Sequence, residues 1–171
     1  MNGHNLESFV KTVLLADLRS MVYECGLLYL AYGQIAVGIE FLGACGDAYD
    51  FDQQGHSKSR FERGIADFME KVDARYATYN KSASPYYLYK HLRCGMAHII
   101  RPQGKIGMIG RGQAQEGGIQ HVEVYPKLDK LVLVAESFYD DFEKACQILL
   151  ADIPKLTHPK IKAIFLAVNQ V

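Results

Sequence analysis

The stretch LLYLAYGQIAVGI, Leu27–Ile39, is the most apolar part of the sequence. Its apolar residues cover nearly the whole circumference of a helix, which predicts a helix buried at the centre of the fold. The stretch is too short to span a bilayer, contains Gln34 and is flanked by Glu24 and Glu40, so the pattern favours a core helix over a membrane span. We therefore expect a central helix from about Tyr23 to Gly43.

Glycines recur along this expected helix. Each one weakens a helix by about 1 kcal/mol relative to alanine. Such a cost is expected where a second backbone packs closely against the helix and leaves no room for a Cβ atom. The glycines are Gly26, Gly33, Gly38 and Gly43.

Amphipathic patterns upstream and downstream predict further helices. Apolar residues recur at helical spacing over about 5–22, which predicts a helix with one buried face. After a loop, Ser59 and Glu62 have the spacing of a capping box and predict a helix that ends near Ala74.

The chain then offers a fourth helix start, at Ser84 with Pro85 in the first helical position. This helix should end before Pro102, because the residue before a proline avoids the α region. A fifth helix is expected over 137–153, and a last short helix after Pro159.

Between these helices the apolar period changes from 3.6 to 2. KIGMIGR, QHVEVYP and KLVLVAE read as three short strands, separated by a flexible loop at GQAQEGG and a tight turn at 126–129. The fold class expected is therefore mainly α, a helical bundle with an inserted three-stranded antiparallel β meander. One domain, 1–171, would hold the bundle at about 5–100 and 137–170 and the meander at about 104–136.

Composition excludes some classes of function. The formal net charge is zero, so the chain as a whole is no electrostatic binder of nucleic acid or membranes. No signal-peptide pattern stands at the N-terminus, and no Cys-x-x-Cys pair occurs, which predicts reduced thiols and a cytoplasmic protein. The cysteines are Cys25, Cys45, Cys94 and Cys146.

Charge is unevenly distributed within this neutral chain. Residues 74–115 contain no Asp or Glu. Such a segment would attract a phosphate-bearing partner, and its interleaved tyrosines could stack on exposed bases. The alternative is that the cations pair with acids elsewhere while the tyrosines pack at a surface. The cations are Arg75, Lys81, Lys90, Arg93, Arg101, Lys105 and Arg111, and the tyrosines are Tyr76, Tyr79, Tyr86, Tyr87 and Tyr89.

The centre of this basic segment is LYKHLRCGMAHIIRP, Leu88–Pro102. On a helix, His91, Cys94 and His98 share one face. Arg93 lies about 140° from His98, because five residues advance about 500°. The two side chains converge only if the helix distorts near Gly95 or if a second copy of the chain faces the first.

Three interpretations of this stretch remain open. The first is a metal site with His91, Cys94 and His98 as ligands, although no second ligand pair occurs elsewhere. The second is a packing face in which Gly95 admits a close neighbour. The third is phosphoryl chemistry, in which His98 transfers a proton and Arg93 neutralises a phosphate.

The residues RCGMAH, Arg93–His98, resemble the arginine, four to six residues, histidine motif of the HEPN superfamily. Glu40, at the end of an apolar helical stretch, is similar to an acidic residue often found there in that family. The resemblance covers roughly 5–100 and 137–153 and leaves the β segment unexplained. It implies a small helical homodimer that either cleaves RNA without metal, as toxin and defence enzymes do, or binds RNA, nucleotides or protein partners.

One position departs from that family pattern. The residue after the arginine is commonly polar, often asparagine, and here it is Cys94. We predict Arg93 and His98 as catalytic residues, with Glu40 and Cys94 supporting them and no metal or cofactor. The phosphate-binding residues expected are Lys90, His91, Arg101 and Lys105. The alternative is a non-catalytic RNA-binding, nucleotide-binding or regulatory dimer, and an antitoxin protein is a further expected partner.

Overall fold

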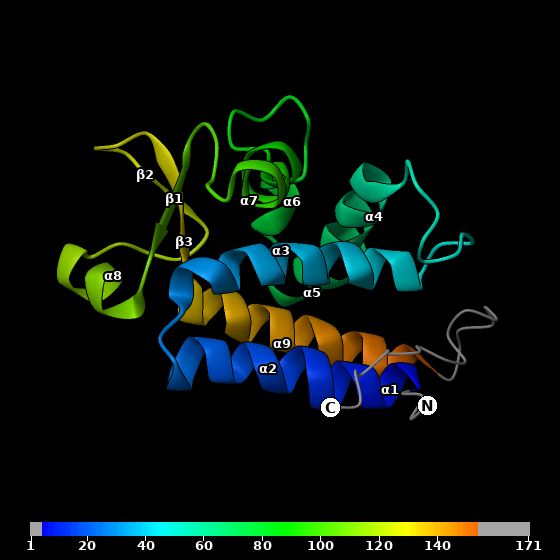
Figure 1. Cartoon of the computed structure of the whole chain (residues 1–171). Coiled ribbons are helices and arrows are strands. Elements are labelled where there is room, and N and C mark those ends of the chain that lie inside the picture. Colours follow the sequence, from blue (N-terminus) through cyan, green and yellow to red (C-terminus); the bar gives the residue numbers. More distant parts are fainter. Residues whose placement is uncertain (1–4, 154–171) are drawn as a thin grey trace.

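The computed structural model describes residues 5–153, which form a mainly helical molecule with one small sheet at one end (Figure 1). The first helical rod runs from Leu6 to Glu24 and confirms the helix expected over 5–22. Its side-chain cap is Asn5, whose Oδ1 accepts the N–H of Ser8 at 2.8 Å. The rod alternates α-helical and π-helical turns: α1 (Leu6–Phe9), η1 (Val10–Leu15), α2 (Ala16–Arg19) and η2 (Ser20–Glu24).

The central helix is α3 (Leu28–Cys45), which starts later than the sequence indicated. Gly26 has a φ of +65°, a left-handed conformation that reverses the chain between η2 and α3. Ile35, Ile39 and Leu42 of α3 are fully buried, as expected of the core helix. By length and composition α3 could cross a membrane, but 56% of it is buried inside the fold, as in the core helix of a soluble protein.

The next helical stretch crosses α3 with the two backbones in close contact. A Cβ atom on Gly43 would lie 1.7 Å from the carbonyl oxygen of Arg60, and one on Gly64 would lie 2.0 Å from that of Ile39. The expectation that a backbone packs against the glycines is confirmed for Gly43 alone. Gly33 and Gly38 face the side chains of Met96 and Phe142, and Gly26 precedes α3. The stretch comprises α4 (Ser57–Gly64), η3 (Ile65–Met69) and α5 (Glu70–Val72).

The predicted capping box at its start is wrong. The helix begins at Ser57, and Ser59 already lies inside it, with its hydroxyl donating to the carbonyl oxygen of His56 at 3.0 Å. The helix expected from Ser84 also starts later, at Leu88, because the Ser84 hydroxyl accepts the N–H of Tyr86 and closes a turn instead.

Three helical segments follow α5, and the last ends before Pro102, as expected. Ile100 ends it in a left-handed conformation with a φ of +54°. The segments are α6 (Tyr76–Tyr79), η4 (Tyr89–Arg93) and α7 (Cys94–Ile99).

The sheet is mixed, and the predicted antiparallel meander is wrong. Strand β3 lies between the other two, parallel to β1 and antiparallel to β2. The expected loop GQAQEGG lies largely in helix α8, which connects β1 to β2. The two strands that it connects are not neighbours in the sheet, because β3 pairs with both of them. The elements are β1 (Ile106–Ile109), α8 (Arg111–Gly117), β2 (Glu123–Tyr125) and β3 (Lys130–Val134).

Helix α9 (Ala135–Asp152) follows β3 directly and matches the expected fifth helix. It runs beside the N-terminal rod and α3 (Figure 1), with the ring of Phe142 against Gly38 and with Asp140 accepting the hydroxyl of Tyr23 at 2.5 Å. The last helix, expected after Pro159, lies outside the described residues.

Candidate functional site

The antiparallel pairing of α3 with η4 and α7 brings together the acid and the arginine named from the sequence. At one end of this pairing Arg93 contacts Glu40. At the other end the hydroxyl of Tyr29 donates to the carbonyl oxygen of Ile100 at 2.7 Å. Residues 53 positions apart in the chain therefore meet at the candidate site.

Glu40 anchors Arg93 through a single nitrogen. The Nε of Arg93 donates to Oε2 of Glu40 at 2.5 Å, and the side chains are 17% and 18% exposed. Ser57 Oγ donates to the same oxygen at 2.9 Å, and the Tyr89 hydroxyl lies 3.4 Å from Ser57 Oγ. Within residues 5–153, the two terminal nitrogens of Arg93 donate to no side chain or carbonyl. The guanidinium is thus held in position while its terminal N–H groups stay available.

His98 lies one turn further along α7 and is exposed. The chain from Cys94 to Ile99 is regular α-helix, and the π-helical turn lies before it, at η4. The rotation of about 140° between Arg93 and His98 is therefore retained. One chain presents the two side chains in different directions, and Gly95 introduces no distortion that would bring them together.

Gly95 serves packing within the chain. A Cβ atom there would lie 2.5 Å from the carbonyl oxygen of Arg101, because the segment after α7 folds back over the helix. Cys94 beside it is partly buried. Burial raises the pKa of Tyr89, and the neighbouring Cys94 thiol raises it further.

His91 is covered by the same returning segment. Its ring lies against Gly104, where a Cβ atom would approach Nδ1 to 2.6 Å, and this Nδ1 is buried without a hydrogen-bond partner in the described structure. Burial lowers the pKa of His91, and the charge of Lys90 lowers it further. The arrangement therefore gives His91 the environment of a packing residue.

More than half of the cations in the acid-free segment pair with acids elsewhere. Lys105 pairs with Asp129, and Arg111 pairs with Asp140 at 2.8 Å. Arg75 pairs with Asp73 at 2.6 Å, and Arg93 pairs with Glu40. Within the acid-free segment, whose residues are all described, the cations that form no ion pair are Lys81, Lys90 and Arg101, all exposed. Of the expected phosphate ligands, Lys90 and Arg101 remain open to a partner.

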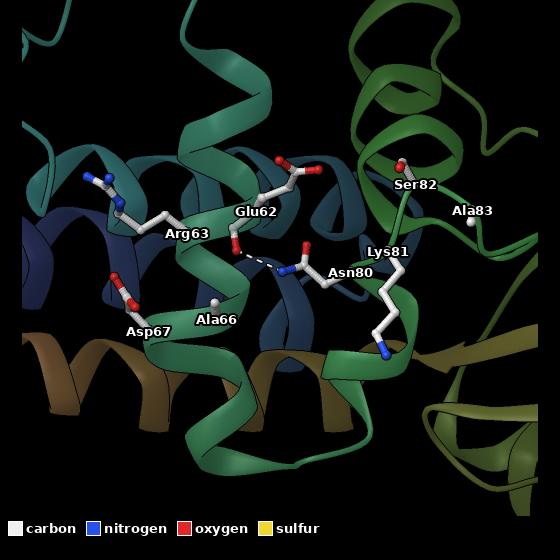
Figure 2. A pocket seen from close by; sticks show the side chains of 8 residues that line it. All are labelled: Glu62, Arg63, Ala66, Asp67, Asn80, Lys81, Ser82 and Ala83. Atoms are coloured by element: carbon white, nitrogen blue, oxygen red, sulfur yellow. Dashed lines mark hydrogen bonds between the residues drawn. The ribbon is translucent and has the colours of Figure 1, made fainter.

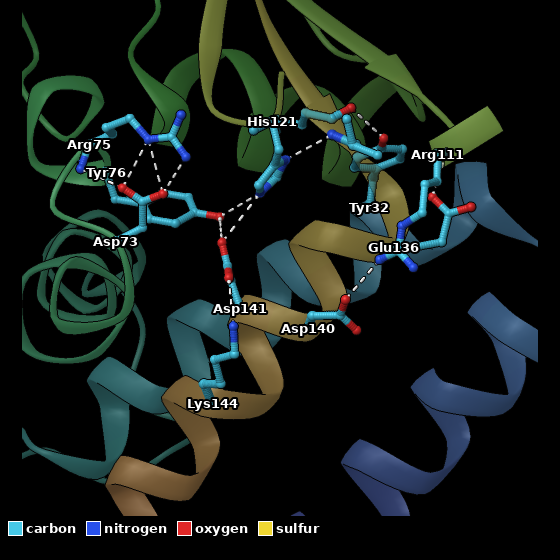
Figure 3. Close-up of polar contacts among 12 residues, drawn as sticks. Tyr32, Asp73, Arg75, Tyr76, Arg111, His121, Glu136, Asp140, Asp141 and Lys144 are labelled. Atoms are coloured by element: carbon cyan, nitrogen blue, oxygen red, sulfur yellow. Dashed lines mark hydrogen bonds and ion pairs between the residues drawn. The ribbon is translucent and has the colours of Figure 1, made fainter. Parts of the chain in front are cut away.

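The tyrosines of this segment mostly pack. Tyr76 and Tyr87 are buried, and Tyr79 meets Tyr86 edge to face at 6.1 Å. Figure 3 shows Tyr76 in a polar cluster that the sequence did not reveal, where its hydroxyl lies 3.0 Å from His121 Nε2 and donates to Asp141 at 3.2 Å. This cluster joins α6, the loop before β2, and α9, and only their tertiary arrangement identifies it.

Exposed apolar side chains lie on both sides of the contact between Tyr29 of α3 and Ile100 at the end of α7. We call them the α7 patch, which combines residues of α3 with the last residues of the motif helix. Such grouped exposed side chains are typical of an interaction surface. The patch consists of Tyr29, Leu30, Ile99 and Ile100, which are 46%, 48%, 47% and 64% exposed.

A hollow of about 660 Å³ lies away from this site. Figure 2 shows it between α4–η3 and the segment 80–83, with side chains of both charges around it. Asn80 Nδ2 donates across it to the carbonyl oxygen of Glu62 at 2.9 Å. Within residues 5–153, no three His, Cys, Asp or Glu side chains are grouped as metal ligands.

No protein-family model, curated protein or solved structure matches this chain. The HEPN resemblance therefore continues to rest on Arg93–His98 and Glu40, and it stays a prediction. The geometry adds that Glu40 and Arg93 are in contact.

Proposed function

We propose that this protein is a homodimeric, metal-independent ribonuclease of HEPN type. The observation that carries the proposal is the anchoring of Arg93 through Nε alone. A guanidinium held in this way keeps its terminal N–H groups for the oxygens of a phosphate, which the planar fork of arginine matches. Glu40 is a positioning residue in this proposal, because it acts through Arg93.

The proposed reaction is attack of an RNA 2′-hydroxyl on the adjacent phosphorus. The His98 imidazole removes the 2′-hydroxyl proton, the 2′ oxygen bonds to phosphorus, and the bond from phosphorus to the 5′ oxygen breaks. The leaving oxygen takes up a proton from the imidazolium. The products are a 2′,3′-cyclic phosphate and a 5′-hydroxyl, and Arg93 stabilises the charge on the pentavalent phosphate.

A second copy of the chain is part of the proposal. Within one chain Arg93 and His98 point in different directions, so a twofold axis near α7 would bring His98 of one copy toward Arg93 of the other. The α7 patch supports this arrangement, because it places apolar surface beside His98 where a partner would cover it. Lys90 and Arg101, exposed near the same helix, would hold flanking phosphates.

The alternative is a non-catalytic module that binds RNA or a nucleotide, or regulates a partner such as an antitoxin. The separation of Arg93 from His98 favours it, as does the half-buried Cys94 at a position that is commonly polar in the family. The same cations would then bind phosphate without cleavage.

RNA cleavage in EDTA tests the proposal. His98→Ala should lower the rate about 10²–10⁴-fold by removing proton transfer. Arg93→Ala should lower it about 10²–10³-fold by removing charge stabilisation. Lys81→Ala is the matched control, since Lys81 is an exposed cation outside the site, and it should leave the rate unchanged.

Two outcomes would redirect the interpretation. Binding of RNA without cleavage, lost in Arg93→Ala, would establish the non-catalytic alternative. Light scattering that shows only the 19.2 kDa monomer, under conditions where RNA is cleaved, would exclude the composite site.

A further inference from the structure

A small pocket opens beside the Glu40–Arg93 pair, at the C-terminal half of α3. Its volume of about 300 Å³ is at the lower end of the range for ligand pockets. The walls come from α3, from the loop that follows it and from α4. The lining residues are Val37, Glu40, Phe41, Ala44, Phe51 and Arg60.

The walls of the pocket are largely apolar. The rings of Phe41 and Phe51 stack with centroids 5.4 Å apart and an interplanar angle of 16°. Arg60 closes another side, but its Nε donates to Asp47 and its terminal nitrogens donate to the carbonyl oxygens of Asp50 and Phe51. Arg60 therefore contributes a wall and offers little charge to a ligand.

Glu40 supplies the polar group through which the pocket can select a ligand. Its Oε2 accepts Arg93 Nε and Ser57 Oγ, whereas its Oε1 accepts from no residue within 5–153. A carboxylate oxygen beside apolar walls is stabilised by a donor that enters with the ligand. The pocket thus combines an aromatic stack with one hydrogen-bond acceptor.

We infer that this pocket binds a nucleobase that carries an amino group. The base would stack on the phenylalanine pair, and its amino group would donate to Oε1 of Glu40. Uracil fits less well, because two carbonyl oxygens flank its one ring N–H donor and the carboxylate repels them. The inference rests on the proposed function for its biological sense, since a base held at Glu40 places the attached phosphate near Arg93.

Nucleosides without phosphate test the pocket independently of Arg93. Titration of the intact chain with adenosine, cytidine and uridine, followed by NMR, should shift resonances of Phe41, Ala44 and Phe51. Adenosine and cytidine should bind about 10-fold or more tightly than uridine, because only they offer an amino donor to a charged acceptor.

Two substitutions should weaken nucleoside binding in different ways. Phe51→Ala removes a stacking ring and should lower the affinity about 5- to 100-fold. Phe51→Leu keeps the apolar volume and should lower it in the same direction, which preserves the test if the alanine variant unfolds. Leu128→Ala, an exposed residue in the turn before β3, is the control and should leave the affinity unchanged.

The inference is overturned if no nucleoside shifts the pocket resonances, if uridine binds as tightly as cytidine, or if both Phe51 variants bind normally. These results are separable from the fate of the ribonuclease proposal. If RNA cleavage depends on His98 but no nucleoside binds the pocket, only the nucleobase inference is refuted. If nucleosides bind at Phe51 but the protein neither cleaves nor binds RNA, only the ribonuclease proposal is refuted.

Discussion

Two arginines on neighbouring elements show how differently the same residue type is used. Arg60, in α4, is 5% exposed, pairs with Asp47 at 2.6 Å and donates to carbonyl oxygens of the loop before it. Arg93, in η4, pairs with Glu40 through Nε and keeps its terminal nitrogens open. A guanidinium whose donors are occupied holds a loop in place. One whose donors are free can bind a ligand.

Exchanging these two arginines for alanine should separate stability from function. Arg60→Ala removes the only cation paired with the buried carboxylate of Asp47 among the described residues and should lower the free energy of unfolding by about 3–5 kcal/mol. Arg93→Ala should lower it by about 1 kcal/mol, since Glu40 keeps Ser57 and some solvent contact.

Denaturant unfolding and RNA binding or cleavage, measured on both variants, check this prediction. Equal losses of stability would contradict the distinction between the two arginines. Retention of RNA binding and cleavage in Arg93→Ala would show that its free donors have no functional part.

Helices α3 and α4 cross so closely that an added Cβ atom at the crossing should destabilise the fold. Gly43→Ala places a Cβ atom against the carbonyl oxygen of Arg60 and should lower the free energy of unfolding by about 3 kcal/mol. Gly112→Ala is the matched control, because nothing lies within 4 Å of its Cβ position in α8. The control should be neutral or stabilising by up to about 1 kcal/mol in a thermal melt. Similar melting temperatures for the two variants would mean that the helices can separate at little cost.

The end of the Arg93 helix should respond in the opposite direction. Ile100→Gly removes the strain of a left-handed β-branched residue and should raise the stability of the monomer by about 0.5–1 kcal/mol. It also removes a 64% exposed side chain from the α7 patch, so the dimer should weaken. Chemical denaturation and light scattering measure the two effects separately, and a variant that dimerises as tightly as the wild type would place the interface elsewhere.

The smallest expected effect is a pH dependence at His91. Burial lowers its pKa below the ordinary 6.5, so the unfolded chain binds more protons between the folded and unfolded pKa values. Stability should therefore fall as the pH is lowered from 6.5 and level off below the folded pKa.

His91→Phe keeps a ring against Gly104 and should remove this decline, whereas His98→Asn should retain it. Thermal melts across the acid range give the measurement. An unchanged pH profile in His91→Phe would assign the decline to other groups.

Helices were predictable from the sequence where local pattern decides structure. The apolar pattern of α3 predicted a buried helix, which holds for one face, whereas Tyr29, Leu30 and Val37 are exposed. Pro102 limited the end of α7. The helix starts predicted at Ser59 and Ser84 were wrong, because each hydroxyl bonds to a nearby backbone group and does not cap a helix. Helix α8 was missed because one of its supports is distant: the N–H of Arg111 donates to Glu136 of α9 at 2.8 Å.

The candidate site was predictable as a set of residues and not as a geometry. The motif pointed to Arg93 and His98, and the resemblance added Glu40. That Glu40 binds Nε alone, that His91 is covered by Gly104 and that Lys105 is neutralised by Asp129 depend on contacts across the chain. No local pattern encodes such contacts.

By itself the sequence determined a mainly helical protein with a buried apolar helix, a neutral total charge and a cationic segment without acids. Only the tertiary structure decided the mixed pairing of the sheet, the neutralisation of most of that segment and the open donors of Arg93. The physical reason is the sequence separation between the groups that interact. Helical periodicity and burial arise from neighbours within a few residues, whereas ion pairs and strand order depend on groups that meet only when the chain has folded.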